Sequence, residues 1–82
     1  MDLEFSEHAE KRLALRKISL DEVIAAMEHP YLVAPGFEPG RLTYDASVGG
    51  RGLRIVVEQD TVPLRVVSVM MRRVPREYRD RI

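Results

Sequence analysis

One row of side chains near the start of the chain combines the residue types that acid–base and phosphate chemistry need. His8, Arg12 and Arg16 recur every four residues, and in a helix this spacing places them side by side along one surface. The apolar stripe of Ala9 and Leu13 borders this row, which puts it at the edge of a packed interface. An imidazole takes up and releases protons near neutral pH, and guanidinium groups bind phosphate bidentately. This row is therefore the first candidate site.

Arginine is concentrated in the second half of the chain. The formal net charge is zero, but residues 1–40 hold eight acids and four bases, whereas residues 41–82 hold five acids and nine bases. Eleven of the thirteen basic residues are arginine, which binds phosphate bidentately and stacks on bases. The late excess therefore favours an anionic partner. The alternative is a surface that is rich in arginine for compositional reasons alone.

The composition limits the classes of protein that the chain can belong to. Its 82 residues are 45% hydrophobic and 32% charged, which predicts one folded domain. The chain has no cysteine, and its two histidines, His8 and His29, have no suitable third ligand nearby, so we expect neither a metal nor a cofactor. The apolar runs are too short to span a bilayer, and the acidic start does not resemble a signal peptide. We therefore expect a cytoplasmic protein without membrane contact.

Two helices are predicted in the first thirty residues. Ser6 can cap the first helix, which carries the row described above. Ser19 and Glu22 have the spacing of a capping box, so a second helix begins there, and the two helices meet at Lys17–Ile18. His29–Pro30 ends the second helix, because proline disfavours helical geometry in the residue before it.

Strands are predicted from residue 31 onward, where short apolar runs alternate with proline and glycine. The predicted strands cover residues 31–34, 41–46, 53–59 and 64–71. Pro35 confines the first strand to an edge of the sheet or shortens it. After Pro75, a short helix is expected, with Tyr78 and Ile82 packing at i and i+4.

The resulting prediction is an α+β fold in a single domain of residues 1–82. Two N-terminal helices, within residues 1–30, pack on one face of a three- or four-stranded antiparallel sheet. The sheet occupies residues 31–71, and residues 72–82 form a basic tail.

The last strand has apolar residues on both of its faces. With strict alternation, Leu64, Val66, Ser68 and Met70 face one way, and Arg65, Val67, Val69 and Met71 face the other. Two helices can cover only one face of a small sheet. Because an exposed apolar patch is unusual on a lone protein, we expect the C-terminal tail, a second copy or a separate partner to cover the other face. A homodimer would form through Val67, Val69 and Met71.

Residues 5–30 resemble a known family. They contain Ser6-Glu7-His8-Ala9, Arg12, Arg16, Ile18-Ser19 and a final His29-Pro30. This series resembles the start of the DUF4258 family, which has a second helix and a small antiparallel sheet after it. That family is similar to the RelE and BrnT toxins. The resemblance implies a RelE-like fold and an endoribonuclease toxin that acts on RNA or the ribosome and is held in check by an antitoxin.

The resemblance also suggests roles for individual residues. Metal-free cleavage of RNA needs a base for the 2′-OH, cations for the phosphate and an acid for the leaving oxygen. His8 would serve as base or acid, with Arg12 and Arg16 as cations; only these three match the family's recognisable stretch. On chemistry alone, the candidate nucleic-acid contacts are Tyr44, Arg54, Arg65, Arg72 and Arg73. A second histidine late in the chain is lacking, so an acid–base pair would be incomplete.

Structural roles compete with each of these assignments. His8 can fix the first helix by a hydrogen bond, Arg12 and Arg16 can pair with neighbouring carboxylates, and Tyr44 can be a half-buried strand residue. Two functional hypotheses follow. The first is a toxin-like RNA-binding protein or metal-independent endoribonuclease. The second is a noncatalytic module that binds protein or nucleic acid through the open sheet face and the basic tail.

Overall fold

Two capped helices lie within the first thirty residues, as predicted. Helix α1, Glu7–Arg16, starts at Ser6, whose hydroxyl accepts a hydrogen bond from a backbone N–H of the first turn. Helix α2, Leu20–Glu28, starts at the predicted capping box: the Ser19 hydroxyl accepts from the Glu22 N–H, and the Glu22 carboxylate accepts from the Ser19 N–H. Together these bonds satisfy backbone donors that the first turn of a helix leaves without partners.

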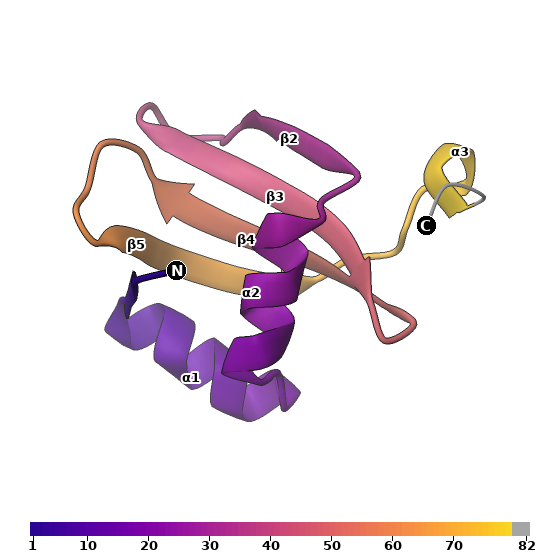
Figure 1. Ribbon diagram of the computed structural model, residues 1–82, viewed down its shortest axis with the longest axis horizontal. Helices are drawn as coiled ribbons and strands as arrows, with labels where there is room; N and C mark the ends of the chain where they lie inside the picture. Colours follow the sequence, from indigo (N-terminus) through magenta and orange to yellow (C-terminus); the bar gives the residue numbers. More distant parts are fainter. Residues whose placement is uncertain (80–82) are drawn as a thin grey trace.

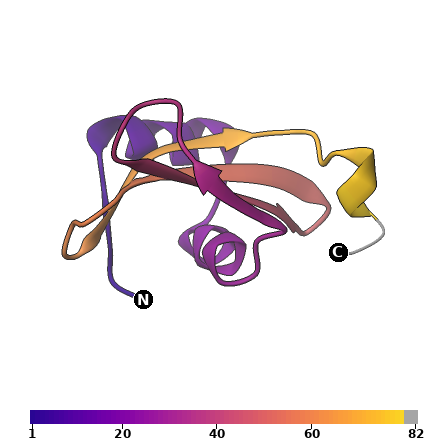
Figure 2. The ribbon, with the colours of Figure 1, turned by 90° about the horizontal axis from the view of Figure 1, so that it is seen from above.

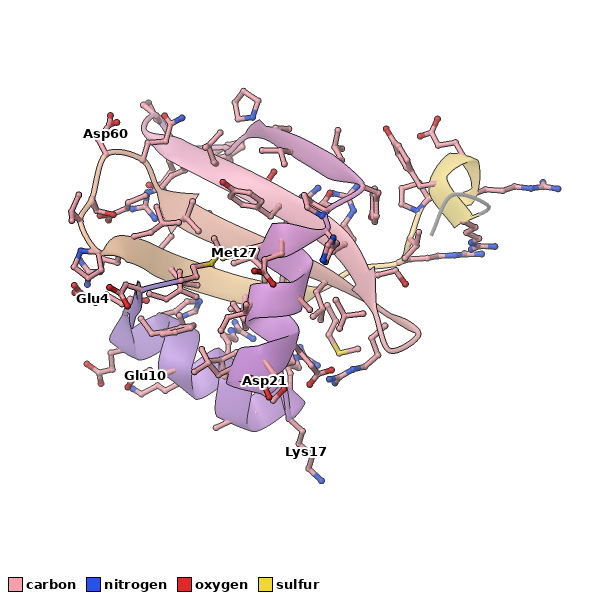
Figure 3. All side chains as sticks on the ribbon, in the orientation of Figure 1. Glu4, Glu10, Lys17, Asp21, Met27 and Asp60 are labelled. Carbon is pink, nitrogen blue, oxygen red and sulfur yellow. The ribbon has the colours of Figure 1, made fainter. Side chains whose placement is uncertain are left out.

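The two helices join and end at the predicted positions. Lys17 adopts a left-handed conformation with φ of 53° and ends α1, and Figure 3 shows its side chain projecting away from the molecule. Ile18 and Val23, on either side of the second cap, are both buried in the core. Helix α2 ends at Glu28, and His29 is its C-cap residue. The boundaries set by caps and by Pro30 are therefore confirmed.

The sheet has five strands in the computed structural model, which describes residues 1–79. The strands are β1 (Leu3–Phe5), β2 (Leu32–Pro35), β3 (Arg41–Val48), β4 (Arg51–Glu58) and β5 (Leu64–Met71), and a short helix, α3 (Arg76–Arg79), follows them. Their order in the sheet is β1-β5-β4-β3-β2. Strands β2 to β5 form an antiparallel meander with β2 at the edge, as Pro35 predicted.

The expected three- or four-stranded antiparallel sheet is wrong in two respects. The sheet has five strands, and β1 pairs with β5 in parallel, with Leu3 opposite Leu64 and Phe5 opposite Val66. The N-terminal strand alternates in the way its sequence suggests, because Leu3 and Phe5 pack against the core while Glu4 is exposed. Three residues are too few to identify a pairing partner so far along the chain. The α+β class itself is confirmed.

Helices α1 and α2 cover one face of the sheet. Helix α1 lies along β5, and α2 crosses β3 and β4 (Figure 1). The core between these layers consists of Ala9, Ile18, Val23, Ala26, Met27, Ala46, Leu53, Ile55, Val57, Val66 and Val69. Each fully buried valine, leucine or isoleucine among them stabilises the fold by about 1.5–3 kcal/mol. The opposite face, which neither of these helices covers, is called the open face below.

A β-bulge in β5 changes which of its residues face the helices. Val57 pairs with Val66, but Val56 pairs with Ser68, so Val67 is an extra residue without a direct partner. One extra residue reverses the alternation that follows it. Val69 therefore lies opposite Ile55 and is completely buried in the core.

The expectation that Val67, Val69 and Met71 share the open face is consequently wrong. Val69 belongs to the helix-covered core, and Met71 pairs with Leu53, a core residue on the same side. Val67 is half-buried and, with Ser68 and Met70, lines a cavity on the open face. Whether two copies associate stays a prediction, but Val69 is not available as a contact.

Arg51 ties the β3–β4 hairpin to the helices. Its guanidinium forms an ion pair with Glu22 of α2 and donates hydrogen bonds to the carbonyl oxygens of Arg16 and Lys17. The hydrogen bond from Arg51, followed by that from the Ser19 N–H, holds the pKa of Glu22 below its ordinary value.

Among residues 1–79, no helix has the length and apolar character needed to cross a membrane.

Candidate functional site

The predicted row lies on α1, on the helix-covered side of the sheet. His8 and Arg16 are exposed, and Arg12 is half-buried. Within residues 1–79, none of the three forms an ion pair with a carboxylate, and the neighbouring Glu22 binds Arg51 instead. The row is thus present and solvent-accessible. None of its residues lines the cavities described below.

A buried carboxylate organises the open face. Asp45 is only 1% exposed, and Arg54 on the neighbouring strand binds it bidentately, with Nε–Oδ1 and Nη2–Oδ2 distances of 2.7 and 2.8 Å. Nη1 of Arg72 lies 3.5 Å from Oδ2 of the same carboxylate. Two predicted arginines therefore meet at one acid that the sequence analysis did not select. Asp45 binds Arg54 with both oxygens, so the more distant Arg72 retains most of its positive charge.

Two stacked tyrosines link α3 to the residue that precedes β2. The rings of Tyr31 and Tyr78 are stacked with centroids 4.7 Å apart, and the Tyr31 N–H donates to the Asp45 carbonyl oxygen at 2.8 Å. Burial, and then the negative charge of Asp45, raise the pKa of Tyr31. Tyr78 thus packs on Tyr31; its expected contact with Ile82 lies outside the described residues. The stack places α3 at the end of the sheet farthest from the N-terminus (Figures 1 and 2).

The other arginines of the open face have acidic neighbours. Nη2 of Arg41 lies 3.8 Å from Glu38 and 3.6 Å from Glu58, and Nε of Arg65 lies 3.9 Å from Glu4. These partly exposed pairs contribute little stability, but they reduce the charge available to a ligand. Arg65, a predicted phosphate contact, is therefore a weak candidate.

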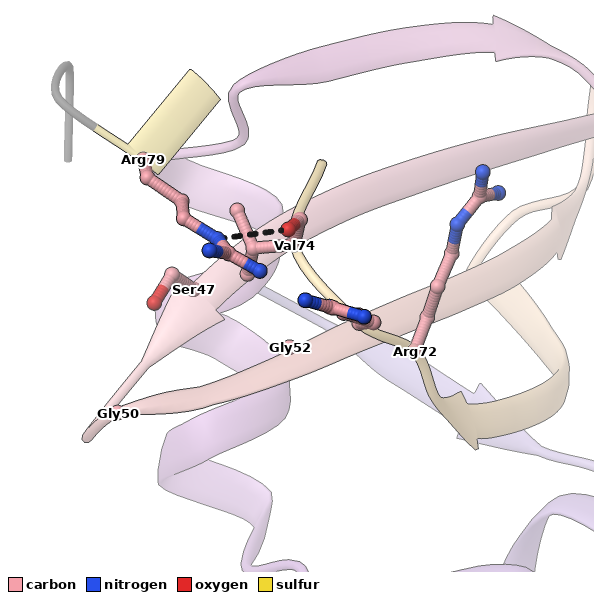
Figure 4. A pocket seen from close by; sticks show the side chains of 7 residues that line it. Ser47, Gly50, Gly52, Arg72, Val74 and Arg79 are labelled. Atoms are coloured by element: carbon pink, nitrogen blue, oxygen red, sulfur yellow. Dashed lines mark hydrogen bonds between the residues drawn. The ribbon is translucent and has the colours of Figure 1, made fainter. Parts of the chain in front are cut away.

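Free positive charge gathers where the tail leaves β5. A cavity of about 400 Å³, called the basic cavity, opens at this point (Figure 4). It is lined by Ser47, Gly50, Gly52, Arg72, Arg73, Val74 and Arg79. No acidic residue within residues 1–79 lines it, and neither Arg73 nor Arg79 forms an ion pair with a described carboxylate.

The backbone positions the arginines of the basic cavity. The Arg72 N–H donates to the Gly52 carbonyl oxygen at 2.8 Å, and a Cβ on Gly52 would lie 1.7 Å from the Arg72 carbonyl oxygen. The tail therefore crosses directly over Gly52, which only a residue without a side chain permits. Nε of Arg79 donates to the Val74 carbonyl oxygen at 3.3 Å, which turns α3 back toward the cavity (Figure 4).

A second cavity of about 250 Å³, called the amphipathic cavity, lies further along the open face. It is lined by Phe37, Glu38, Arg41, Thr43, Arg54, Val56, Val67, Ser68 and Met70. The Phe37 ring is fully exposed at the loop between β2 and β3. Sequence reasoning did not select Phe37 as a functional residue, because a single aromatic residue in a proline- and glycine-rich loop carries no periodic signal.

The predicted site residues thus separate into two groups. Arg54, Arg72 and Arg73 line cavities of the open face, whereas His8, Arg12 and Arg16 lie on α1 across the sheet. Tyr44 pairs with Ile55 and packs against the core, so it occupies the helix-covered side. Within residues 1–79, no cluster of histidine, aspartate and glutamate could hold a metal ion.

The chain belongs to the DUF4258 family. The model of this family, a domain of unknown function, matches residues 5–71. No curated protein and no solved structure matches the chain. The family match ends with β5, so the tail that supplies Arg72, Arg73 and Arg79 lies outside it.

Proposed function

We propose that this protein binds single-stranded RNA and that the basic cavity contacts the RNA phosphates. The observation that carries the proposal is the convergence of Arg72, Arg73 and Arg79 on a cavity without a described acidic residue. Electrostatic contacts between arginine and phosphate supply much of the affinity of proteins for nucleic acids. Phosphate contacts of this kind fix the position of the strand without reading its sequence.

Two glycines make the basic cavity suitable for a phosphate group of the RNA backbone. Gly50 and Gly52 line it, so their peptide groups, not side chains, form part of its wall. Arginine forks bind two oxygens of one phosphate group with fixed geometry. The basic cavity lies at the end of the sheet. An RNA strand with one phosphate in this cavity can therefore extend past it in both directions.

The proposal extends to the class of protein. The resemblance of residues 5–30 supports a relationship with the RelE and BrnT toxins, in which two N-terminal helices would pack on one face of the sheet. A protein antitoxin would then cover the basic cavity, and the RNA target would be messenger RNA or the ribosome. Such a protein would act in the cytoplasm.

We propose RNA binding rather than RNA cleavage as the main function. An acid or base must lie within hydrogen-bond reach of the reacting group, and His8 does not line the basic cavity. The noncatalytic alternative therefore fits the geometry better than an endoribonuclease does. His8, Arg12 and Arg16 remain a separate exposed row without an assigned ligand.

A pair of matched charge reversals tests the proposal. Binding of a fluorescent single-stranded RNA of about twelve nucleotides is measured by anisotropy in EDTA. We expect the double variant Arg73→Glu and Arg79→Glu to lower affinity at least about tenfold and to reduce the salt dependence of binding. The double variant Arg12→Glu and Arg16→Glu changes the net charge equally on the other side of the sheet, so it controls for general electrostatics.

Two results would contradict the proposal. If the wild type fails to bind RNA at low ionic strength, the protein is not an RNA-binding protein of this kind. If both double variants weaken binding equally, the basic cavity is not the site.

A further inference from the structure

We propose that the amphipathic cavity binds an unpaired nucleobase of the same strand whose phosphate lies in the basic cavity. This inference rests on the proposed function and deepens it, because it assigns the ligand as single-stranded nucleic acid with accessible bases. Three observations carry it: the adjacency of the two cavities, the neutrality of the second, and the exposed ring at its rim.

The two cavities occupy consecutive rows of the open face. Asp45, Arg54 and Met70 lie opposite one another across three strands. Two residues further along β3 and β4, Ser47 lies opposite Gly52 in the basic cavity. Two residues of a strand span about 7 Å. The nearest lining residues of the two cavities are therefore about 7 Å apart, and the far end of the amphipathic cavity, at Arg41, lies six residues from Ser47 along β3. One strand can thus place a phosphate in the first cavity and the base of a nearby nucleotide in the second.

The charge of the amphipathic cavity is already balanced. Arg54 is bound bidentately by Asp45, and Arg41 lies near Glu38 and Glu58. A cavity of this kind has little affinity for a second phosphate. A guanidinium that is held flat by a carboxylate still offers its face for stacking, which suits a planar neutral group.

The other residues that line the amphipathic cavity suit both the apolar faces and the polar edge of a nucleobase. Val56, Val67 and Met70 supply apolar surface for the flat faces of the ring. The Ser68 hydroxyl also lines the cavity and can donate to or accept from polar groups at the edge of a base. The Thr43 hydroxyl donates to the Ala34 carbonyl oxygen at 3.3 Å, so it can act there as an acceptor. An apolar side chain of a protein partner would leave the Ser68 hydroxyl without a complementary partner, so a base is the better occupant.

Phe37 is positioned to stack on that base. Its ring is fully exposed, yet the backbone on both sides is fixed. The Gly36 N–H donates to the Arg41 carbonyl oxygen at 2.8 Å, and the Arg41 N–H donates to the Glu38 carbonyl oxygen at 3.3 Å. A fixed loop that presents an aromatic ring beside a cavity is an effective stacking platform, because every base has a π face.

The test compares Phe37→Ala with Leu15→Ala, which removes an exposed side chain (68% exposed) on the far side of the sheet. The ligands are an oligouridine of about twelve nucleotides and an oligomer of equal length with abasic spacers instead of nucleosides. We expect the wild type to bind oligouridine more tightly than the abasic oligomer. Phe37→Ala should lower oligouridine affinity by about 5- to 100-fold and leave abasic binding unchanged; Leu15→Ala should change neither.

The outcomes separate this inference from the proposed function. If the wild type binds both oligomers equally, or if Phe37→Ala binds oligouridine as the wild type does, the base site is wrong, whereas the phosphate site stands. If the wild type binds neither oligomer, the proposed function and this inference are both wrong. Because Phe37 makes no buried contact, loss of folding does not confound the variant, and a circular dichroism spectrum verifies this.

Discussion

Asp45 shows how one buried residue governs the candidate site. It binds Arg54 with two short hydrogen bonds and lies within 3.5 Å of Arg72, so it positions arginines that line both cavities. Burial of a charge is costly unless partners satisfy it. The arginines were identifiable from the sequence by their chemistry. Asp45 was not, because an isolated aspartate in a predicted strand looks the same whether it is buried or exposed.

We predict that Asp45→Asn destabilises the protein by about 1–3 kcal/mol. The amide keeps the shape of the side chain but removes the charge that faces Arg54, whose own partial exposure limits the cost. Urea unfolding followed by circular dichroism measures the change. Glu38→Gln is the matched control: its pair with Arg41 is 3.8 Å long and largely exposed, so the loss should stay below about 0.5 kcal/mol. Equal losses in the two variants would show that Asp45 is not a structural ion-pair partner.

At the scale of the elements, local signals were sufficient for the helices but not for the sheet. The caps at Ser6 and Ser19 and the stop at Pro30 act over three or four residues, so the sequence contains all the information that they require. The parallel pairing of β1 with β5 joins residues about sixty positions apart. The bulge at Val67 depends on how β5 meets β4. A pattern read along a single strand cannot reveal either one.

The bulge leads to a prediction about the stability of variants at Val67 and Val69. Val69→Ala should destabilise the protein by about 1.5–3 kcal/mol, because it removes buried apolar surface and leaves a cavity in the core. Val67→Ala should cost less than about 1 kcal/mol, because Val67 is only half-buried and lines an open cavity. Denaturant midpoints of the two variants measure the difference. A larger loss for Val67→Ala would contradict the bulged register and support simple alternation.

At the scale of the whole molecule, the sheet separates two kinds of surface. The helix-covered side carries the core and, on the outer surface of α1, the row of His8, Arg12 and Arg16. The open side carries Asp45 and both cavities. Sequence reasoning assigned both the row on α1 and the late arginines to RNA because it could identify the chemistry of each side chain but not the face on which it lies. Three of the late arginines, Arg72, Arg73 and Arg79, line the basic cavity.

The junction between the sheet and the tail gives the last prediction, Gly52→Ala. The added Cβ would lie 1.7 Å from the Arg72 carbonyl oxygen, and this contact is with backbone, which a change of rotamer cannot relieve. The tail must therefore move away from the sheet, and Arg72, Arg73 and Arg79 must move with it. We expect RNA affinity to fall about tenfold, as it does when phosphate contacts are lost.

The fold outside the tail should tolerate Gly52→Ala, because Gly52 is not among the glycines with positive φ and alanine is compatible with a strand there. Circular dichroism should therefore retain the helical signal. Ser47→Ala, at the paired position on β3, alters the same cavity without adding atoms and should bind RNA as the wild type does. If Gly52→Ala binds RNA with wild-type affinity, the close crossing of the tail does not position the arginines, and the basic cavity would not be the phosphate site.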